Sequence, residues 1–163
     1  MNLDKYETTA SKSLMVFEFY SVGPKGKIKK KIEFNRFSET SNVYNICFGD
    51  VDTNGEIDDL AITDNNDRQK VLATVAAASV KFLEKYPDKY VYASGSTKAR
   101  SRLYKIGISK NLDEILHTFD LYGYDDKWEP FEKGKHYLEF LIQLKIKTLP
   151  LKNDEEKRKK RTN

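Results

Sequence analysis

Residues 90–108, with the sequence YVYASGSTKARSRLYKIGI, join a strand pattern directly to a helix pattern. The segment begins with an uncharged run at 90–93 that favours β-structure, as expected of a strand covered on both faces. After a short polar break, Ala99, Leu103 and Ile106 recur at i, i+4 and i+7, which predicts a helix with these side chains on one face. The chain must therefore fold into a structure that combines a sheet with helices.

The charges at the start of this predicted helix are unusual. Lys98, Arg100 and Arg102 occupy its first turns, where the helix dipole favours carboxylates over cations. Together with a glycine-containing turn, hydroxyl groups and exposed N–H groups, they predict a site for a phosphate or another anion. The residues assigned to this site are Ser94, Gly95, Ser96, Thr97, Lys98, Arg100, Arg102 and Tyr104. The alternative is that the three cations point into water or pair with acids such as Asp64 and Asp67.

Alternating apolar residues and turn signals divide the rest of the chain into further elements. Strands are predicted at 14–22, 27–37, 43–50, 56–63, 119–124 and 137–147, helices at 68–86 and 111–117, and an irregular loop at 125–135. With the central unit included, the order is β-β-β-β-α-β-α-β-β. This order predicts an α+β fold, with a mixed, mostly antiparallel twisted sheet and helices packed on it.

The chain is predicted to form a single domain over residues 14–149. Residues 1–13 are expected to be a flexible lead-in, and residues 150–163 a disordered charged tail that lacks the apolar content to fold. Residues 152–163 hold six Lys or Arg and three Asp or Glu, which is +3 of the net charge of +4. The folded part carries only about +1, so it exerts no general attraction on nucleic acid.

Other features of the sequence indicate the cellular setting. There is no apolar run long enough to span a bilayer and no secretory signal at the N-terminus. The single cysteine, Cys47, has no second cysteine with which to form an internal disulfide. We therefore expect a cytoplasmic protein that does not enter the membrane. Its oligomeric state is not indicated.

Three consecutive lysines at 29–31 lie within one of the predicted strands. Apolar and charged residues alternate there, which places Lys29 and Lys31 on a solvated face. A run of this kind is more typical of a solvated or edge-protecting strand than of a phosphate site.

Residues 50–58 match the opening of a calcium-binding loop, D-x-D-x-[DN]-G. The twelfth position is Ala61 instead of a bidentate glutamate, and the flanking residues alternate as strands do. Asn54-Gly55 is by itself a strong signal for a hairpin turn. Because the two histidines are also isolated in the sequence, we predict no metal site and no bound cofactor.

Five segments together are similar to an uncharacterised bacterial family of small α+β proteins. They are FGD at 48–50, EIDDL at 56–60, DxQKVLATV at 67–75, GST at 95–97 and ARxRLY at 99–104. The resemblance spans about residues 16–147. It implies no activity, since none is established for that family.

The layout of a hairpin, a helix, a strand, a helix ending in RLYKIG and two further strands resembles the GNAT-class acetyltransferases. This resemblance implies that Tyr104 matches the late-helix tyrosine that protonates the leaving thiolate. The class holds the coenzyme A pyrophosphate on a Q/R-x-x-G-x-G/A turn. The matching residues here, 67–73, contain no glycine and begin with an acid.

Three functions are compatible with these patterns. The first is a non-catalytic binding module for an anion or phosphate, carried by a nucleotide or nucleic acid. The second is a divergent acyltransferase-like protein that lacks the coenzyme A pyrophosphate motif. The third is a protein–protein interaction or accessory defence module, which suits an aromatic content of 12%. The patterns leave open whether the protein is an enzyme.

Overall fold

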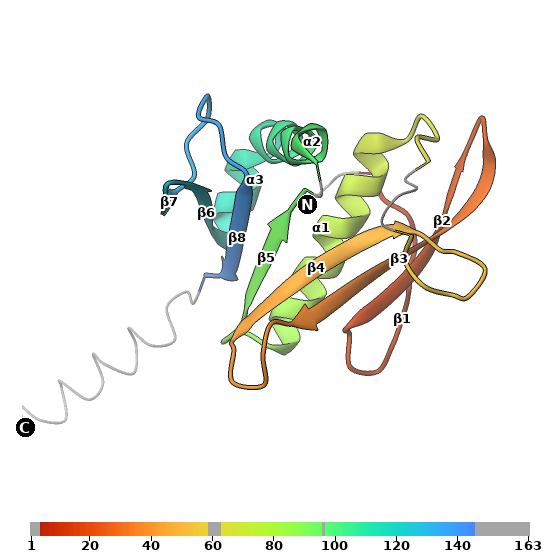
Figure 1. The fold of residues 1–163 in the computed structure, drawn as a ribbon, viewed down its shortest axis with the longest axis horizontal. Coiled ribbons are helices and arrows are strands. Elements are labelled where there is room, and N and C mark those ends of the chain that lie inside the picture. The colour runs from red at the N-terminus through yellow and green to blue at the C-terminus, as the bar shows by residue number, and fades with distance from the viewer. Residues whose placement is uncertain (1–3, 59–62, 96, 146–163) are drawn as a thin grey trace, which may run out of the picture.

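The computed structural model describes residues 4–58, 63–95 and 97–145 of the chain. In this part three helices lie against an open sheet of eight strands (Figure 1). The strands are β1 (Thr9–Ala10), β2 (Val16–Gly23), β3 (Gly26–Arg36), β4 (Val43–Asp50), β5 (Tyr90–Ser94), β6 (Phe119–Asp125), β7 (Lys127–Pro130) and β8 (Glu139–Leu144). The helices are α1 (Arg68–Lys85), α2 (Lys98–Lys110) and α3 (Leu112–Thr118). The predicted α+β fold is confirmed.

The sheet is mixed and mostly antiparallel, as predicted. Its order is β1-β2-β3-β4-β5-β8-β6-β7, and only the β4–β5 pair is parallel. A parallel pair needs a crossover connection, and α1 supplies it. The two strands pair only from Val43↔Tyr90 to Asn45↔Tyr92, although β4 continues to Asp50 and β5 to Ser94. Beyond that short ladder they diverge (Figure 1).

The larger core lies between α1 and strands β2 to β4. Phe82 of α1 has no exposed surface and stacks on Phe34, with the ring centroids 4.4 Å apart and the planes within 4°. Tyr44 and Tyr86 contact the same ring, each with its centroid at 5.1 Å. A second cluster, formed by Leu121, Phe131, Tyr137 and Phe140, packs against α2 and α3. The two clusters fasten opposite halves of the sheet to different helices.

The face that α2 buries differs from the predicted one. Ala99 is exposed and Ile106 is 40% exposed, whereas Ser101 and Gly107 are buried. The helix approaches its neighbours through these small residues, and a Cβ on Gly107 would lie 2.9 Å from Leu72 Cδ1. Periodicity of large apolar residues therefore identified the wrong stripe, because close helix packing here depends on residues with little or no side chain.

The lysine run lies inside the sheet, so the predicted edge-protecting role is wrong, whereas the predicted solvated face holds for Lys29, whose side chain is 41% exposed. β3 pairs with β2 on one side and with β4 on the other. Lys29 pairs with Glu18 at 3.1 Å on the uncovered face, and Lys30 points to the opposite face and is 2% exposed. These lysines can occupy an interior strand because Lys29 and Lys30 each form an ion pair with an acidic side chain.

Three other segments differ between the prediction and the structure. The turn at 52–55 forms with Gly55 at φ 80°, but of the strand predicted at 56–63 only an isolated Val51↔Ile57 bridge is present, and 59–62 lie outside the described residues. The predicted irregular loop contains β7, which pairs with β6 through a turn where Asp126 has φ 68°. β1 was not predicted.

The predicted domain limits stay a prediction. The sheet does extend N-terminal of residue 14, because Thr9 pairs with Glu18. The tail at 150–163 lies outside the described residues. Among the helices of the described part, none has the length and apolar character needed to cross a membrane.

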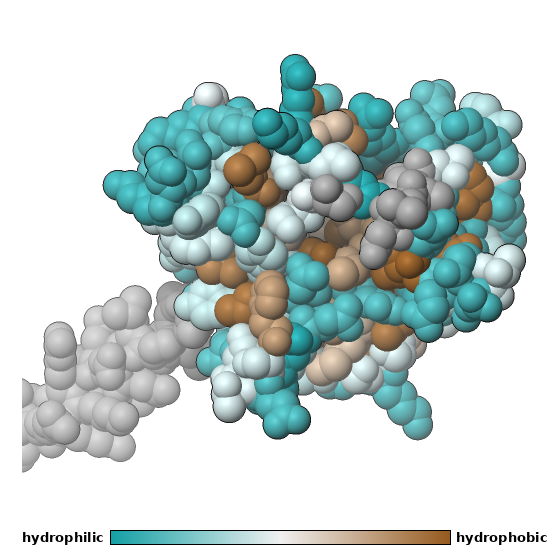
Figure 2. All heavy atoms as spheres, viewed as in Figure 1, coloured by the Kyte–Doolittle hydropathy of each residue, from teal (hydrophilic) through white to brown (hydrophobic). Residues whose placement is uncertain are grey.

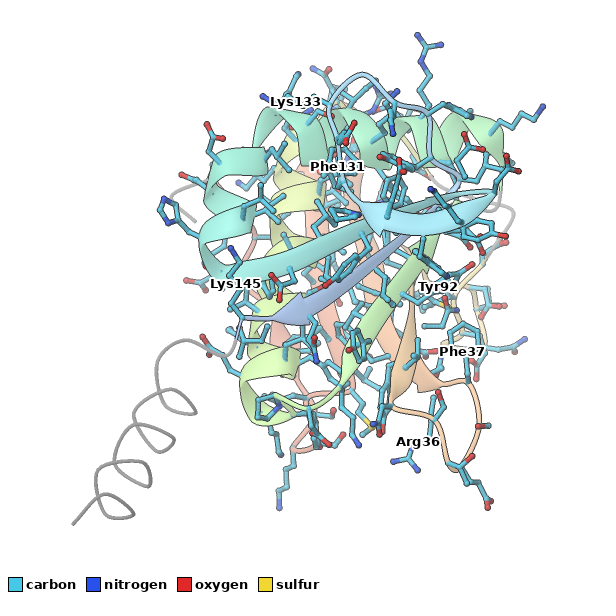
Figure 3. All side chains as sticks on the ribbon, turned by 90° about the vertical axis from the view of Figure 1, so that its left-hand side faces the viewer. Arg36, Phe37, Tyr92, Phe131, Lys133 and Lys145 are labelled. Atoms are coloured by element: carbon cyan, nitrogen blue, oxygen red, sulfur yellow. The ribbon has the colours of Figure 1, made fainter. Side chains whose placement is uncertain are left out.

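A row of aromatic rings occupies the sheet face turned away from α1. Phe37 contacts Tyr92 at 5.2 Å between centroids, Tyr92 contacts Trp128 at 6.3 Å, and Trp128 contacts Tyr124 at 5.2 Å. Phe37 and Tyr92 lie side by side at this surface (Figure 3). Phe37 is 57% and Trp128 42% exposed. Exposed rings of this kind are common in contact surfaces between proteins.

Candidate functional site

The point where β4 and β5 diverge is the start of a line of cavities. A pocket of about 270 Å³, here called the polar pocket, lies between β4, the first turn of α1 and α2. Its lining residues are Lys30, Phe48, Thr63, Asp64, Asp67, Arg68, Val71, Leu72, Arg100, Leu103 and Tyr104. The face between α2 and β4 is visibly hollowed, with hydrophobic atoms at the bottom (Figure 2). The structure therefore places charged groups and apolar walls around one opening.

Two of the residues predicted for anion binding meet in this pocket. Arg100 and Tyr104 both line it, one helical turn apart on α2. Burial raises the pKa of the Tyr104 phenol, and the positive charge of Arg100 offsets part of that rise. The phenol is therefore protonated at neutral pH and can donate a hydrogen bond. Its ring also contacts Phe48, with the centroids 5.7 Å apart.

The other two predicted cations lie elsewhere on α2. Lys98 and Arg102 are exposed, and their i, i+4 spacing places them on a shared face. Arg100 is half-buried and, being two residues from each, projects from a different side of the helix. The three charges thus do not converge on one point.

Polar groups of the turn before α2 make hydrogen bonds to the first residues of the helix. The Thr97 hydroxyl accepts a hydrogen bond from the Arg100 N–H at 3.2 Å, which caps the helix. Gly95 donates its N–H to the Ser101 hydroxyl at 3.1 Å, and a Cβ on Gly95 would overlap the Ser101 backbone nitrogen. Ser94 is exposed at the end of β5, and Ser96 lies outside the described residues. Anion binding by this turn stays a prediction.

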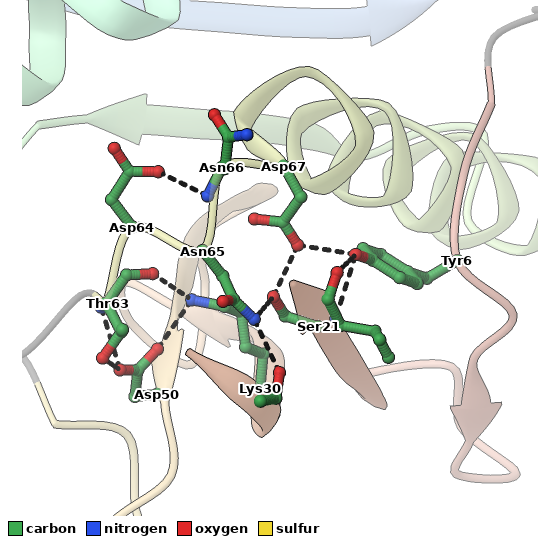
Figure 4. A network of polar contacts seen from close by, with 11 residues as sticks. Tyr6, Ser21, Lys30, Asp50, Thr63, Asp64, Asn65, Asn66 and Asp67 are labelled. Atoms are coloured by element: carbon green, nitrogen blue, oxygen red, sulfur yellow. Dashed lines mark hydrogen bonds and ion pairs between the residues drawn. The ribbon is translucent and has the colours of Figure 1, made fainter. Parts of the chain in front are cut away.

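The positive end of α1 faces the polar pocket without an acidic cap. Asp67 precedes the helix, but its side chain makes no capping bond. Its Oδ2 instead accepts hydrogen bonds from the Ser21 hydroxyl at 2.5 Å and the Tyr6 hydroxyl at 2.6 Å (Figure 4). No acidic residue occupies the first turn, and Arg68 lies 3.6 Å from Asp64. The helix dipole at this end favours an anion, and Asp64 and Asp67 line the pocket beside it.

Lys30, which lines the pocket, forms a buried ion pair with Asp50 that sequence reasoning missed. Lys30 Nζ lies 2.7 Å from Asp50 Oδ1 and donates a further bond to the Thr63 carbonyl at 3.3 Å (Figure 4). The other carboxylate oxygen of Asp50 accepts from the Thr63 N–H at 2.9 Å and its hydroxyl at 2.6 Å. The missed signal was register, because Lys30 alternates in phase with the buried Ile32.

The ion pair includes the first residue of the calcium-like sequence at 50–58. Burial alone would raise the pKa of Asp50, but the hydrogen bonds from Lys30 and Thr63 outweigh it and lower that pKa below the usual value. Asp50, the first residue of that sequence, is thus bonded within the protein. In the described ranges no three His, Cys, Asp or Glu side chains are grouped so that they could hold a metal ion.

Comparison with known proteins identifies the family of the chain. A family model described as a family of unknown function, DUF6934, matches residues 2–145. The chain belongs to the DUF6934 family. Searches of curated proteins and of solved structures found no match. The prediction that the chain belongs to an uncharacterised family is confirmed by this match.

Every residue that lines the polar pocket of this DUF6934 protein lies inside the matched range. The same holds for the buried pair of Lys30 and Asp50 and for the segment that carries Tyr6. The pocket is therefore built entirely from the part of the chain that defines membership of the family.

Proposed function

We propose that this DUF6934 protein binds a small anionic ligand, and that the anion lies in the polar pocket between Arg100 and Tyr104. The observation that carries this proposal is the meeting of these two side chains beside the uncapped positive end of α1. An arginine can bind a phosphate or carboxylate with two parallel hydrogen bonds. The protonated phenol of Tyr104 supplies a third donor.

Two other cations that line the pocket have acidic neighbours. Lys30 is paired with Asp50, and Arg68 lies close to Asp64. The Asp67 carboxylate accepts hydrogen bonds from the hydroxyl groups of Ser21 and Tyr6. The exposed Lys98 and Arg102 contribute long-range attraction near the entrance, as distinct from contacts inside it. Phosphate groups, such as those of a nucleotide, are the chemistry that this arrangement favours.

Replacing Arg100 by glutamine is expected to weaken the binding of inorganic pyrophosphate at least tenfold. The reason is that a hydrogen bond to a charged group contributes about 1.5–3 kcal/mol. Isothermal titration calorimetry at low ionic strength measures the change. The matched control is Arg102→Gln, which removes the same charge from the exposed side of α2 and should change the affinity less than about threefold. Equal losses in both variants would contradict the proposal.

Acyl transfer is a second candidate, favoured by the divergence of β4 from β5 next to a protonated tyrosine. A thioester lying in this opening would present its sulfur to Tyr104. When an amine attacks the carbonyl carbon, a C–N bond forms, the C–S bond breaks and the phenol gives its proton to the thiolate. The nitrogen loses one proton to solvent as it becomes an amide, and solvent returns a proton to the phenolate. The resemblance to GNAT-class acetyltransferases supports this reading.

In that case, Tyr104→Phe should lower the release of free thiol from acetyl-coenzyme A by about 10²–10⁴-fold, while the affinity for the thioester is unchanged. A thiol-reactive dye in the presence of an amine acceptor measures the release. If wild-type protein gives no heat of binding with millimolar acetyl-coenzyme A, acyl transfer is excluded.

A further inference from the structure

We propose that the ligand is an amphiphile, with its anionic head in the polar pocket and an unbranched apolar chain in the cavities behind it. This inference rests on the proposed anion binding, because it uses the same Arg100 and Tyr104 for the head group. It adds the chemical class of the remainder of the ligand.

The cavities behind the polar pocket adjoin one another. A second pocket of about 150 Å³ lies between α1 and α2 and shares Phe48, Leu72 and Tyr104 with the polar pocket. A third cavity of about 130 Å³ lies deeper and shares Ile46, Ala76 and further apolar residues with the second. The line of cavities thus leads from charged groups at the entrance to the apolar interior beneath β8.

The deep cavity provides little for a polar group to bind. Among the described residues that line it, Ser79 alone is polar, and its hydroxyl donates to the Val75 carbonyl at 3.0 Å. The second pocket also has Tyr104, which it shares with the polar pocket, the exposed Gln69, and Asn111, whose amide donates to the Gly107 carbonyl at 2.9 Å, so the deep cavity is the most apolar part of the line. A sugar or a nucleobase would lose its hydrogen bonds to water there without replacement. Methylene groups lose nothing of the kind and gain from burial.

Small residues contribute to the space in these cavities. Ala73 and Ala76 of α1, Ala93 of β5 and Gly107 of α2 line the second pocket. Ile46, Val75, Ile108 and other lining residues remain half-buried although they lie between helix and sheet. Apolar surface at this position is therefore accessible to an apolar chain.

The test is a series of straight-chain alkyl phosphates from ethyl to decyl, each below its micelle concentration, compared with inorganic phosphate by calorimetry. Affinity is expected to rise about fourfold per methylene and then to level off when the cavities are full. Arg100→Gln should weaken every member of the series.

Larger side chains in the cavities should shorten the range of chain lengths over which affinity rises. Ala76→Leu is expected to leave ethyl phosphate unaffected and to weaken the longest chains at least tenfold, whereas Ala99→Leu on the exposed side of α2 should change neither. Ala93→Leu blocks the same path from the sheet side and replaces Ala76→Leu if the latter fails to fold, as judged by its thermal unfolding.

The outcomes separate the two proposals. If inorganic phosphate binds through Arg100 but affinity does not depend on chain length, the amphiphile inference is overturned and the anion site stands. If chain length matters but neither filling variant weakens the long chains, the tails lie elsewhere and the inference is again overturned. If no anion binds, both proposals are wrong.

Discussion

Replacing Phe82 by alanine is expected to lower the free energy of unfolding by about 3–5 kcal/mol. The ring has no exposed surface and contacts Phe34, Tyr44 and Tyr86, so its removal leaves a cavity among three aromatic neighbours from two strands and one helix. Urea unfolding followed by circular dichroism measures the loss. A domain of this size has a total stability of about 5–15 kcal/mol, so the variant should unfold at much lower urea.

The matched control is Phe37→Ala, which removes the same side chain from a position that is 57% exposed. Phe37 has one ring neighbour, Tyr92, so the expected loss is about 1 kcal/mol or less. If the two variants lost the same stability, Phe82 would not be at the centre of the core.

Asp50→Asn is expected to cost about 3–5 kcal/mol, because it leaves the buried Lys30 ammonium without its counter-charge. Thermal or urea unfolding at neutral pH measures this loss. The matched control is Lys29→Met, on the same strand as Lys30. It breaks the exposed ion pair with Glu18 of β2 and should cost less than about 1 kcal/mol. The double variant Lys30→Met, Asp50→Asn should recover part of the loss, since no buried charge then remains.

Asp50→Asn should also change how the free energy of unfolding depends on pH. The pKa of Asp50 is lower in the folded protein than in the unfolded chain, so the pair stabilises the fold at pH values above the unfolded value of about 4. This contribution disappears as the pH falls through the lowered folded-state pKa. Wild-type protein should therefore lose more stability than Asp50→Asn between pH 6 and about pH 3. Parallel acid-induced losses in both proteins would show that Asp50 is not the group involved.

Local patterns predicted most elements because each pattern repeats within a few residues. The alternation of Phe17 and Phe19 with polar neighbours located β2, and the run at 90–93 located β5. The same reasoning failed for α2, where the buried residues are Ser101 and Gly107, and Tyr104 and Ile108 pack against the second cluster. A small residue can mark close packing or a solvated face, and only the surface opposite it distinguishes the two.

The candidate site was predicted in part for a related reason. Arg100 and Tyr104, two of the predicted anion-binding residues, line one pocket, whereas Lys98 and Arg102 were grouped with them by sequence and not by side of the helix. Lys30 was overlooked because its acid, Asp50, lies on another strand.

By itself the sequence determined the positions of β2 to β6, β8 and the helices, the turn at Asn54-Gly55 and the unit formed by β5 and α2. The periodicity of a strand or a helix comes from backbone geometry that spans only a few residues. The tertiary structure alone decided that β4 and β5 part after three paired residues, that Lys30 meets Asp50, and that one arginine of α2 enters a pocket while its neighbours stay outside. These features depend on contacts between segments far apart in the chain, and local periodicity carries no record of which segments meet.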